Sequence, residues 1–418
     1  METMDLQIQP IRRIAFISIH GCPLVVPGEG SAGGMNVYLN KIAPLLVDRG
    51  ICVDIFTKAH ESQTLERNYL RENLRVIHVP VEDHELEKEK FLPSIPFITE
   101  WIKSFAEQEQ FGYDLVHSHY WLSGLVGESI AKYFAIPHAI TYHTIGLVKE
   151  SHYDFEEPNE RKTAEASISE TADKIMAFTA EEAGDIQNLF SVPTKKISIA
   201  QGGVDLGLFH PSDPTIVRRA LSLGDDQKII LYVGRLDPFK GPDILLKSIA
   251  EVPRAVLVIV GGAKDDDGKK WLQKLSVDLG IQGKVIFLSA MPQEFLPSYY
   301  SAADILAIPS YHESFGLVGL EAMACGTPIV AANVGSLRTL VEDGVTGFLI
   351  NEQKHSAYTQ AFNRLLNEQN HSLHSMREAA INFAATKGWE QSVDQLLTAY
   401  SEMIILKGSN PKVVSCVA

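Results

Sequence analysis

The chain has 418 residues, 45% of them hydrophobic and 21% charged, and its formal net charge at pH 7 is −15. This length favours two domains over one, and the composition is that of a soluble globular protein. The acidic balance argues against nucleic acid as a main partner, because binding a phosphate backbone needs a basic face.

The cysteines and the apolar runs indicate the compartment. Cys22, Cys52, Cys325 and Cys416 show neither CxxC pairing nor zinc spacing, which is typical of reduced thiols in a cytoplasmic protein. No apolar run reaches the roughly 18 residues of a membrane span, so we expect no integral membrane segment. The sequence leaves the oligomeric state open, a homodimer included.

Short apolar runs alternate with helical patterns along the whole chain, which predicts parallel sheets with helical crossovers. The first series of expected strands is Ile14–Ser18, Val53–Phe56, Leu115–His117, His138–Thr141 and Lys174–Phe178. After a connection near 204–214, a second series follows at Ile229–Val233, Val256–Val260, Val285–Leu288, Ile305–Ile308 and Pro328–Ala331.

This alternation predicts the α/β class, with two doubly wound Rossmann-like domains facing a central cleft. We place an N-terminal domain at 1–207 and a C-terminal domain at 208–388. The helical stretch 389–407 could belong to either domain, and we assign it to the N-terminal one. Ligands of such sheets lie outside the carboxyl ends of the strands.

A glycine-rich loop, Gly28-Glu29-Gly30-Ser31-Ala32-Gly33-Gly34, follows the first expected strand and opens a helix. Such a loop can bring bare backbone close to phosphate oxygens. It lacks the GxGxxG spacing of a dinucleotide fold and the GxxxxGK(S/T) pattern of a P-loop. A phosphate-binding loop and a plain mobile connection both stay open.

Three histidines lie on or just after expected strands of the first domain. His117 and His119 alternate at strand spacing, so both point to one face. A zinc pair is one interpretation, but no third ligand is evident, and packing in the core or cleft is favoured. For His143, just past a strand, a structural role and a role in the cleft are equally open.

The second domain opens with Val233-Gly234-Arg235-Leu236-Asp237-Pro238-Phe239-Lys240-Gly241. Arg235 and Lys240 fall in the loop between a strand and a helix, where they could neutralise a departing diphosphate. The alternative is two solvated surface cations. Further along, Asp265-Asp266-Asp267 could hold a metal, but a loop that caps the next helix is favoured.

The most informative segment follows the expected strand Ile305–Ile308. Glu313 falls in the loop before a helix, and Glu321 lies about 12 Å further along it, at roughly 1.5 Å per residue. Between them the helix N-terminus offers free N–H groups, and Gly316 allows a ligand close to the backbone. Two carboxylates flanking a phosphate site match a sugar nucleotide, which has two polyhydroxy rings joined by a diphosphate. The alternative is a glutamate that favours the helix dipole plus a solvated one.

The glutamate pair and the Gly-Arg-x-x-x-x-Lys-Gly segment identify a family. From about Arg13 to about Met403 the chain resembles the retaining sugar-nucleotide glycosyltransferases of family four, which have the GT-B fold. Within that family it is most similar to the branch that glycosylates inositol phosphate. That closer likeness rests on the segments 32–38, 113–124 and 312–318.

The resemblance implies a donor site for an NDP-sugar, with a UDP-sugar favoured, and neither a metal nor a cofactor. Arg235 and Lys240 would hold the diphosphate, and Glu313 and His143 would contact the transferred sugar; these four are the expected catalytic residues. Glu321 would hold the ribose. The remaining donor-binding residues would be Gly34, Met291, Phe315, Gly316 and Leu317.

The resemblance also implies a phosphorylated small-molecule acceptor. Its phosphate pocket would consist of Asn36, Tyr113, Thr144 and Arg161, with a lysine supplied by Lys88 or Lys90. Cys22 and the charged stretch 82–90 depart from the pattern of that branch, and the second departure adjoins the pocket. It leaves the acceptor open.

Several functions therefore stay open. The first is transfer of a hexose or N-acetylhexosamine to a phosphorylated polyol. The second is transfer of glucose to fructose 6-phosphate, as in sucrose-phosphate synthases, which typically carry Gln where this chain has Met35. The others are an epimerase or hydrolase of sugar nucleotides on the same fold, and a non-catalytic binding module.

Overall fold

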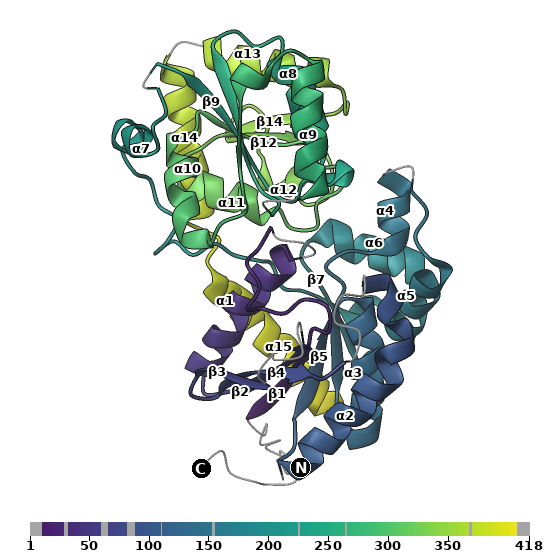
Figure 1. The fold of residues 1–418 in the computed structure, drawn as a ribbon. Coiled ribbons are helices and arrows are strands. Elements are labelled where there is room, and N and C mark those ends of the chain that lie inside the picture. Colours follow the sequence, from purple (N-terminus) through teal and green to yellow (C-terminus); the bar gives the residue numbers. More distant parts are fainter. Residues whose placement is uncertain are drawn as a thin grey trace. The chain divides into compact units, whose positions relative to one another are not determined.

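The chain forms two compact α/β units in the computed structural model (Figure 1). The structure describes residues 11–28, 32–59, 66–81, 88–109, 111–152, 155–224, 226–263, 266–367 and 370–407. Unit 1 contains the described residues of Met1–Leu24, Met35–Gln201 and Ser392–Ala418. Unit 2 contains those of Val25–Gly34 and Gly202–Gln391.

These units differ from the predicted domains at three places. The main crossing lies at 201/202, six residues before the predicted boundary at 207/208. The glycine-rich segment Val25–Gly34 belongs to unit 2, because its glycines pack there: a Cβ added to Gly28 would lie 3.0 Å from Cβ of Ala290. The last helix, α15 (Trp389–Lys407), begins in unit 2 and belongs to unit 1 from Ser392 onward.

The sheet of unit 1 has eight strands in the order β3-β4-β2-β1-β5-β6-β7-β8, parallel except for the β3–β4 pair. The strands are β1 (Arg13–Ile17), β2 (Cys52–Lys58), β3 (Arg67–Arg71), β4 (Leu74–Val79), β5 (Leu115–His119), β6 (His138–Thr141), β7 (Lys174–Ala177) and β8 (Ile197–Ile199). The sequence pattern did not predict β3, β4 or β8. The charged side chains of β3 and β4 interrupt the apolar run that marks a buried strand.

The helices of unit 1 connect these strands. They are α1 (Gly34–Asp48), η1 (Lys88–Ser94), α2 (Ile95–Gln108), α3 (Trp121–Phe134), α4 (Gly146–His152), α5 (Asn159–Thr171), α6 (Ala180–Phe190) and η2 (Thr194–Lys196). α15 is fixed to the unit by side chains: Lys174 pairs with Glu402, and Nζ of Lys407 lies 2.8 Å from Oδ2 of Asp173.

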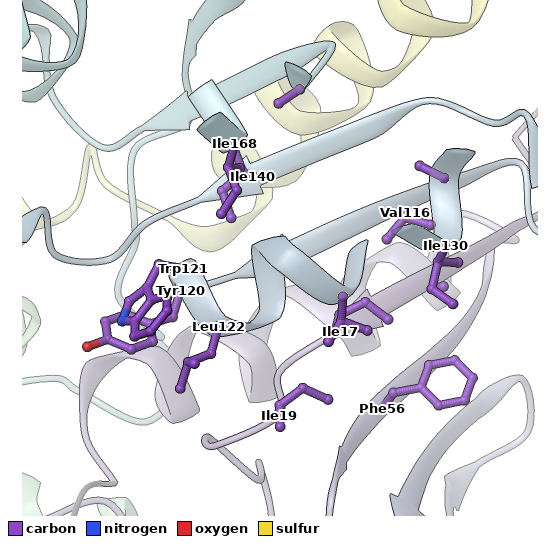
Figure 2. Packing of buried hydrophobic residues seen from close by; sticks show 14 of the residues in the cluster. Ile17, Ile19, Phe56, Val116, Tyr120, Trp121, Leu122, Ile130, Ile140 and Ile168 are labelled. Atoms are coloured by element: carbon purple, nitrogen blue, oxygen red, sulfur yellow. The ribbon is translucent and has the colours of Figure 1, made fainter. Parts of the chain in front are cut away.

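One core of unit 1 lies between the sheet and the helices α2, α3, α5 and α6. Figure 2 shows part of it, with Ile17 of β1, Val116 of β5 and Ile140 of β6 beside side chains of α3 and α5. Alternate residues of a strand face the same side of a sheet, so these strands each send one set of side chains into this core. The packing fixes the strand ends that carry the polar residues described below.

Unit 2 has a six-stranded parallel sheet in the order β11-β10-β9-β12-β13-β14. Its strands are β9 (Lys228–Val233), β10 (Ala255–Val260), β11 (Val285–Leu288), β12 (Ile305–Ile308), β13 (Ile329–Ala332) and β14 (Gly347–Ile350). Its helices are α7 (Pro214–Ala220), η3 (Pro238–Lys240), α8 (Pro242–Ile249), α9 (Asp267–Asp278), η4 (Gln282–Lys284), η5 (Gln293–Phe295), α10 (Leu296–Ala302), α11 (Leu317–Ala324), α12 (Leu337–Leu340), α13 (His355–Asn367) and α14 (Asn370–Ala384).

Helices cover both faces of this sheet, with α8, α9 and α13 on one face and α10, α11 and α14 on the other (Figure 1). β9 shows the alternation directly. Ile229 and Leu231 enter the core under α10 and α11, whereas Ile230 and Tyr232 enter the core under α8 and α13. Within the described residues, no helix has the length and apolar character needed to cross a membrane.

Candidate functional site

The loops that follow β9 and β12 lie side by side in unit 2. The two strands are hydrogen-bonded neighbours, and the strand order reverses between them. Doubly wound sheets bind ligands at such a reversal, outside the carboxyl ends of the strands. The β9 loop carries Arg235 and Lys240, and the β12 loop carries Glu313. The fold therefore brings together three of the charged residues that the sequence singled out in this unit.

Backbone contacts hold these two loops together. The amide of Tyr311 donates to the carbonyl of Phe239 over 3.0 Å. Gly241, with φ of +67°, lies so close to the other loop that an added Cβ would be 2.3 Å from the carbonyl oxygen of Pro309. A side chain at this position would force the loops apart, so glycine is required both for the backbone angle and for the approach.

Lys240 and Glu313 form an ion pair. Nζ of Lys240 lies 2.6 Å from Oε2 of Glu313, and the side chains are only 21% and 18% exposed. The backbone of Glu313 is also fixed, because its carbonyl accepts hydrogen bonds from the amide and the hydroxyl of Ser336, at 2.9 and 3.1 Å. Burial by itself would raise the pKa of Glu313, but the ammonium of Lys240 outweighs it and lowers that pKa below its ordinary value.

Arg235 is also paired with a carboxylate, which the sequence pattern did not single out. Nη1 of Arg235 lies 3.2 Å from Oδ2 of Asp237. Among the described residues no group makes a well-oriented hydrogen bond to either oxygen of Asp237, although both oxygens are buried. Each of the two cations therefore has a carboxylate of its own unit beside it.

Glu321, the fifth residue of α11, is held by two side chains. Its Oε1 accepts a hydrogen bond from Nε2 of Gln293 at 2.6 Å, and its Oε2 accepts one from the hydroxyl of Tyr300 at 2.8 Å. The residue is 5% exposed. These two hydrogen bonds give the buried carboxylate a fixed orientation, which suits recognition of hydroxyl groups.

The remaining expected donor residues surround the start of α11. Gly316 caps this helix with φ of +79°, and Phe315 before it lies against Gly202. Gly34 is also near, since an added Cβ there would lie 3.5 Å from Cδ1 of Leu317. The first amides of a helix point at whatever precedes it, and the helix dipole favours an anion there. Met291, between β11 and η5 in the chain, is partly buried and packs against the same core cluster as Phe315.

In unit 1 the structure brings Arg161 and Thr144 together. Arg161, on α5, is 1% exposed, and its Nη2 donates to the carbonyl and the hydroxyl oxygen of Thr144 at 2.7 and 3.1 Å. The other guanidinium nitrogens contact Glu165 at 2.7 Å and Glu157 at 3.0 Å. Burial alone would lower the pKa of Arg161, but Tyr120 and the two carboxylates raise it. Arg161 therefore stays a cation.

Tyr120 is a residue of this region that sequence reasoning missed. It directly follows β5 and precedes α3, with φ of +76°, and its ring lies 4.9 Å from Cζ of Arg161. The ring of His20 packs against it, with centroids 4.4 Å apart. A positive φ is rare for a residue with a Cβ and occurs where the surroundings enforce it. This backbone conformation indicates that Tyr120 belongs to the site, and it cannot be predicted from the sequence.

His143 follows β6 and also has a positive φ, +60°. Its Nε2 lies 3.1 Å from Nδ1 of His119, and burial lowers its pKa to about 3. The ring of His117 lies tilted against that of His119, and its two nitrogens form hydrogen bonds with Tyr400 and Thr141 at 2.6 and 2.8 Å. Because both nitrogens of His117 are engaged, the zinc interpretation of His117 and His119 has no support among the described residues.

Asn36 and the lysines occupy other positions in unit 1. Nδ2 of Asn36, on α1, donates to the carbonyl of Cys22 at 2.7 Å, and the side chain is buried. Lys90 lies on η1 and is exposed. Lys88 begins η1, but its side chain lies outside the described residues, as do residues 82–87 of the charged stretch.

Tyr113 is not brought together with Thr144 and Arg161. It precedes β5, whereas the polar residues of this site follow strands. Its hydroxyl donates to Oδ2 of Asp54 at 2.8 Å inside a buried network in which Arg75 binds the same carboxylate at 2.7 and 2.8 Å. Burial and the charge of Asp54 raise the pKa of Tyr113. This environment is that of a structural residue, at the opposite end of its strand.

The aspartate run caps a helix, as the sequence favoured. Asp266 is the N-cap of α9, and its carboxylate accepts from the amide of Lys269 at 3.0 Å. Asp267 lies in the first turn, and Asp265 lies outside the described residues. Over the part of the chain that is described, no group of three or more His, Cys, Asp or Glu side chains could hold a metal ion.

Two family models match the chain, "Glycosyltransferase Family 4" over residues 32–208 and "Glycosyl transferases group 1" over residues 214–383. A D-inositol 3-phosphate glycosyltransferase of Stackebrandtia nassauensis is 36% identical in an alignment of 416 residues that covers 96% of this chain and 94% of that relative. The chain belongs to glycosyltransferase family four. It is therefore a glycosyltransferase, as the sequence predicted.

Solved structures of glycosyltransferases share the fold. Sucrose-phosphate synthase from Thermosynechococcus elongatus has a TM-score of 0.89 and 30% identity, over 94% of this chain and all 100% of its own. HepE of Anabaena, solved in complex with UDP, has a TM-score of 0.74 and 22% identity, over 93% of this chain and 100% of its own. The predicted GT-B fold, with two Rossmann-like units, is confirmed.

The placement of Tyr113 gives a first prediction. Tyr113→Phe removes one hydrogen bond inside the buried network, which typically costs about 1 kcal/mol. We expect the melting temperature to fall by about 2–4 °C, while the KM values for both substrates stay unchanged. Tyr133→Phe, at an exposed hydroxyl, is the control and should change neither. A raised acceptor KM at unchanged melting temperature would place Tyr113 in the site after all.

The ion pair of Lys240 and Glu313 gives a second prediction, which concerns pH. In the wild type the lowered pKa of Glu313 contributes stability above its ordinary value of 4.5, and that contribution is lost as the pH falls through the folded-state pKa. In Lys240→Met, burial acts alone and raises the pKa, so the ionised carboxylate destabilises the fold at neutral pH and is relieved on acidification. The difference in melting temperature between the two should be largest near pH 7 and should narrow towards pH 4.5.

The double variant Lys240→Met/Glu313→Gln is the control, because it has no carboxylate to titrate. The difference in melting temperature between this double variant and the wild type should stay the same between pH 7 and pH 4.5. A Lys240→Met difference that is constant with pH would contradict the coupling of these two residues.

Proposed function

We propose that this glycosyltransferase moves a hexose or N-acetylhexosamine from an NDP-sugar, with a UDP-sugar as first choice, to a small phosphorylated polyol or sugar. One observation supports the proposed binding of the NDP-sugar donor. Arg235 and Lys240 lie on a loop beside Glu313, at the reversal of strand order in unit 2. Two cations and two fixed carboxylates suit a diphosphate with a sugar at each end.

The roles of the donor residues follow from their chemistry. Arg235 offers a planar fork and Lys240 a point charge, and both stabilise the negative charge that develops on the leaving diphosphate. The first amides of α11 add neutral donors. Glu321, oriented by Gln293 and Tyr300, accepts hydrogen bonds from the ribose hydroxyls, and Glu313 accepts them from the transferred sugar.

Arg161 supports a phosphorylated acceptor. An arginine that is buried and fixed beside a threonine hydroxyl is a typical binder of phosphate oxygens. Curated relatives named D-inositol 3-phosphate glycosyltransferase, at 36–38% identity, favour an inositol phosphate as the acceptor. We assign Arg161, Thr144 and Tyr120 to the acceptor phosphate.

The proposed reaction retains the anomeric configuration and needs no metal. The bond between the anomeric carbon and the diphosphate oxygen breaks, and a hydroxyl oxygen of the acceptor attacks from the same face. The departing phosphate takes the proton of that hydroxyl. Arg235 and Lys240 supply the counter-charge that a divalent cation supplies in other transferases.

A second acceptor is favoured by one specific observation. The sucrose-phosphate synthase of Thermosynechococcus elongatus matches the fold with a TM-score of 0.89 at 30% identity. Fructose 6-phosphate would also present a phosphate to Arg161, so the pocket chemistry alone does not separate the two acceptors.

The test is a matrix of UDP-sugars against acceptors, with the products read by mass spectrometry and their anomeric configuration by NMR. The acceptors are inositol phosphate, fructose 6-phosphate and unphosphorylated inositol. We expect product only with a phosphorylated acceptor, with retained configuration, and at an unchanged rate after chelation. Turnover of the donor without any acceptor would indicate an epimerase or hydrolase instead. UDP binding without turnover across the matrix would indicate a binding module.

The leaving-group cations give a third prediction. Arg235→Ala and Lys240→Ala should each lower kcat by about 10²–10³-fold, the usual effect of removing one such electrostatic contact. Lys247→Ala is the matched control, because Lys247 lies on the adjoining helix α8 in an exposed pair with Asp243. Near wild-type kcat in both site variants would overturn the donor-site assignment.

A further inference from the structure

Three imidazoles form a cluster in unit 1, at the carboxyl ends of β5 and β6; two of them are buried and that of His143 is half-buried. The rings of His117 and His119 are 4.3 Å apart at their centroids, and those of His119 and His143 are 5.3 Å apart. Tyr38 packs against both His119 and His143, and the hydroxyl of Tyr400 bonds His117. His117 and His119 are 0% exposed.

The hydrogen bond between His119 and His143 needs one donor and one acceptor. It joins Nδ1 of His119 to Nε2 of His143 at 3.1 Å. Burial lowers the pKa of each of the three imidazoles, that of His143 to about 3, so all three are neutral at pH 7. A neutral imidazole carries one N–H and one lone pair. One nitrogen of this pair therefore carries the proton and donates, and the other accepts the hydrogen bond with its lone pair.

The other nitrogen of His119 decides which way the bond runs. Nε2 of His119 is buried and has no hydrogen-bond partner among the described residues. If it carried the proton, a buried donor would be left without an acceptor, which is rarer in proteins than an unsatisfied acceptor. The proton therefore sits on Nδ1 of His119, and Nε2 of His143 accepts the hydrogen bond.

We propose that His119 is a positioning residue that donates its Nδ1–H to His143 and so holds His143 in the neutral tautomer protonated at Nδ1. In this tautomer Nε2 of His143 is occupied, and Nδ1–H is the only donor of the ring. His143 then acts as a fixed neutral hydrogen-bond donor and not as a general base. The hydrogen bond from His119 also stabilises the backbone of His143 at its unfavourable φ of +60°.

The consequence for catalysis rests on the proposed function and on the contact between His143 and the transferred sugar that the family resemblance implies. A neutral N–H donor orients a sugar hydroxyl without competing for the proton that the acceptor releases. That proton then goes to the departing phosphate. His119 touches neither substrate in this arrangement and acts only through His143.

The tautomer can be measured without any substrate. We would label the protein with [15N]histidine, record long-range 1H–15N correlations at pH 7, and assign His143 from the signals lost in His143→Gln. The protonated nitrogen is identified by its chemical shift and by its couplings to the ring protons. We expect His143 to be protonated at Nδ1 and not to titrate between pH 5 and pH 8. Protonation at Nε2 would overturn the proposal.

Two substitutions of His119 separate the hydrogen bond from the packing. His119→Asn keeps an amide N–H where Nδ1–H lies, whereas His119→Leu fills the space without a donor. We expect kcat to fall about tenfold in His119→Leu, the effect of one lost hydrogen bond, with the donor KM changed less than about threefold. His119→Asn should restore most of kcat. Equal losses in both variants would contradict the role of the hydrogen bond.

His138→Asn is the matched control. His138 is another buried histidine, bonded to Ser118 at 2.9 Å, and lies outside this cluster of three. It should lose thermal stability but keep kcat. The two proposals fail in different ways. Absence of sugar transfer overturns the proposed function and leaves the NMR result standing, whereas an Nε2–H tautomer in an active transferase overturns only the role of His119.

Discussion

In both units the order of strands reverses beside the first strand of the sheet, between β1 and β5 and between β9 and β12. At such a reversal the loops leave the sheet on opposite faces, which opens a crevice at the carboxyl ends. Within each unit the positions of the candidate site residues depend on that constraint. Arg235 and Lys240 follow β9, Glu313 follows β12, and Tyr120 follows β5. Residues far apart in the sequence meet because parallel strands end at one edge.

Charge is arranged so that each binding cation already has a partner. The protein carries a formal charge of −15, yet its proposed task is to bind anions. Lys240 lies against Glu313, Arg235 against Asp237, and Arg161 against two glutamates. A buried cation without a counter-ion would be costly. Fixed carboxylates hold these cations in place, so the net charge of the surface need not match that of the ligand.

The sequence predicted the positions of most candidate donor residues, because they lie in two short loops that directly follow apolar strands. Arg235 and Glu313 could be placed at the edge from local pattern alone. Local pattern did not show which of Tyr113 and Tyr120 belongs to the site, because the two residues flank the same strand β5. Tyr120 follows the strand and so lies at its carboxyl end, whereas Tyr113 precedes it. Asp237 and His119 matter through contacts with neighbours, which no local pattern encodes. β3 and β4 were not predicted because charged residues interrupt their apolar runs.

The two backbone outliers in unit 1 connect fold and chemistry. Tyr120 and His143 each follow a strand of the same sheet with a positive φ, of +76° and +60°. For residues with a Cβ this conformation costs on the order of 1–3 kcal/mol, so packing elsewhere must hold it in place. For Tyr120 that packing comes from His20 and Arg161, and for His143 it comes from Tyr38, His119 and Phe178. Because the rings that hold His143 are largely apolar and buried, the same packing that fixes its backbone also keeps its imidazole neutral. Geometry and protonation state therefore have one cause.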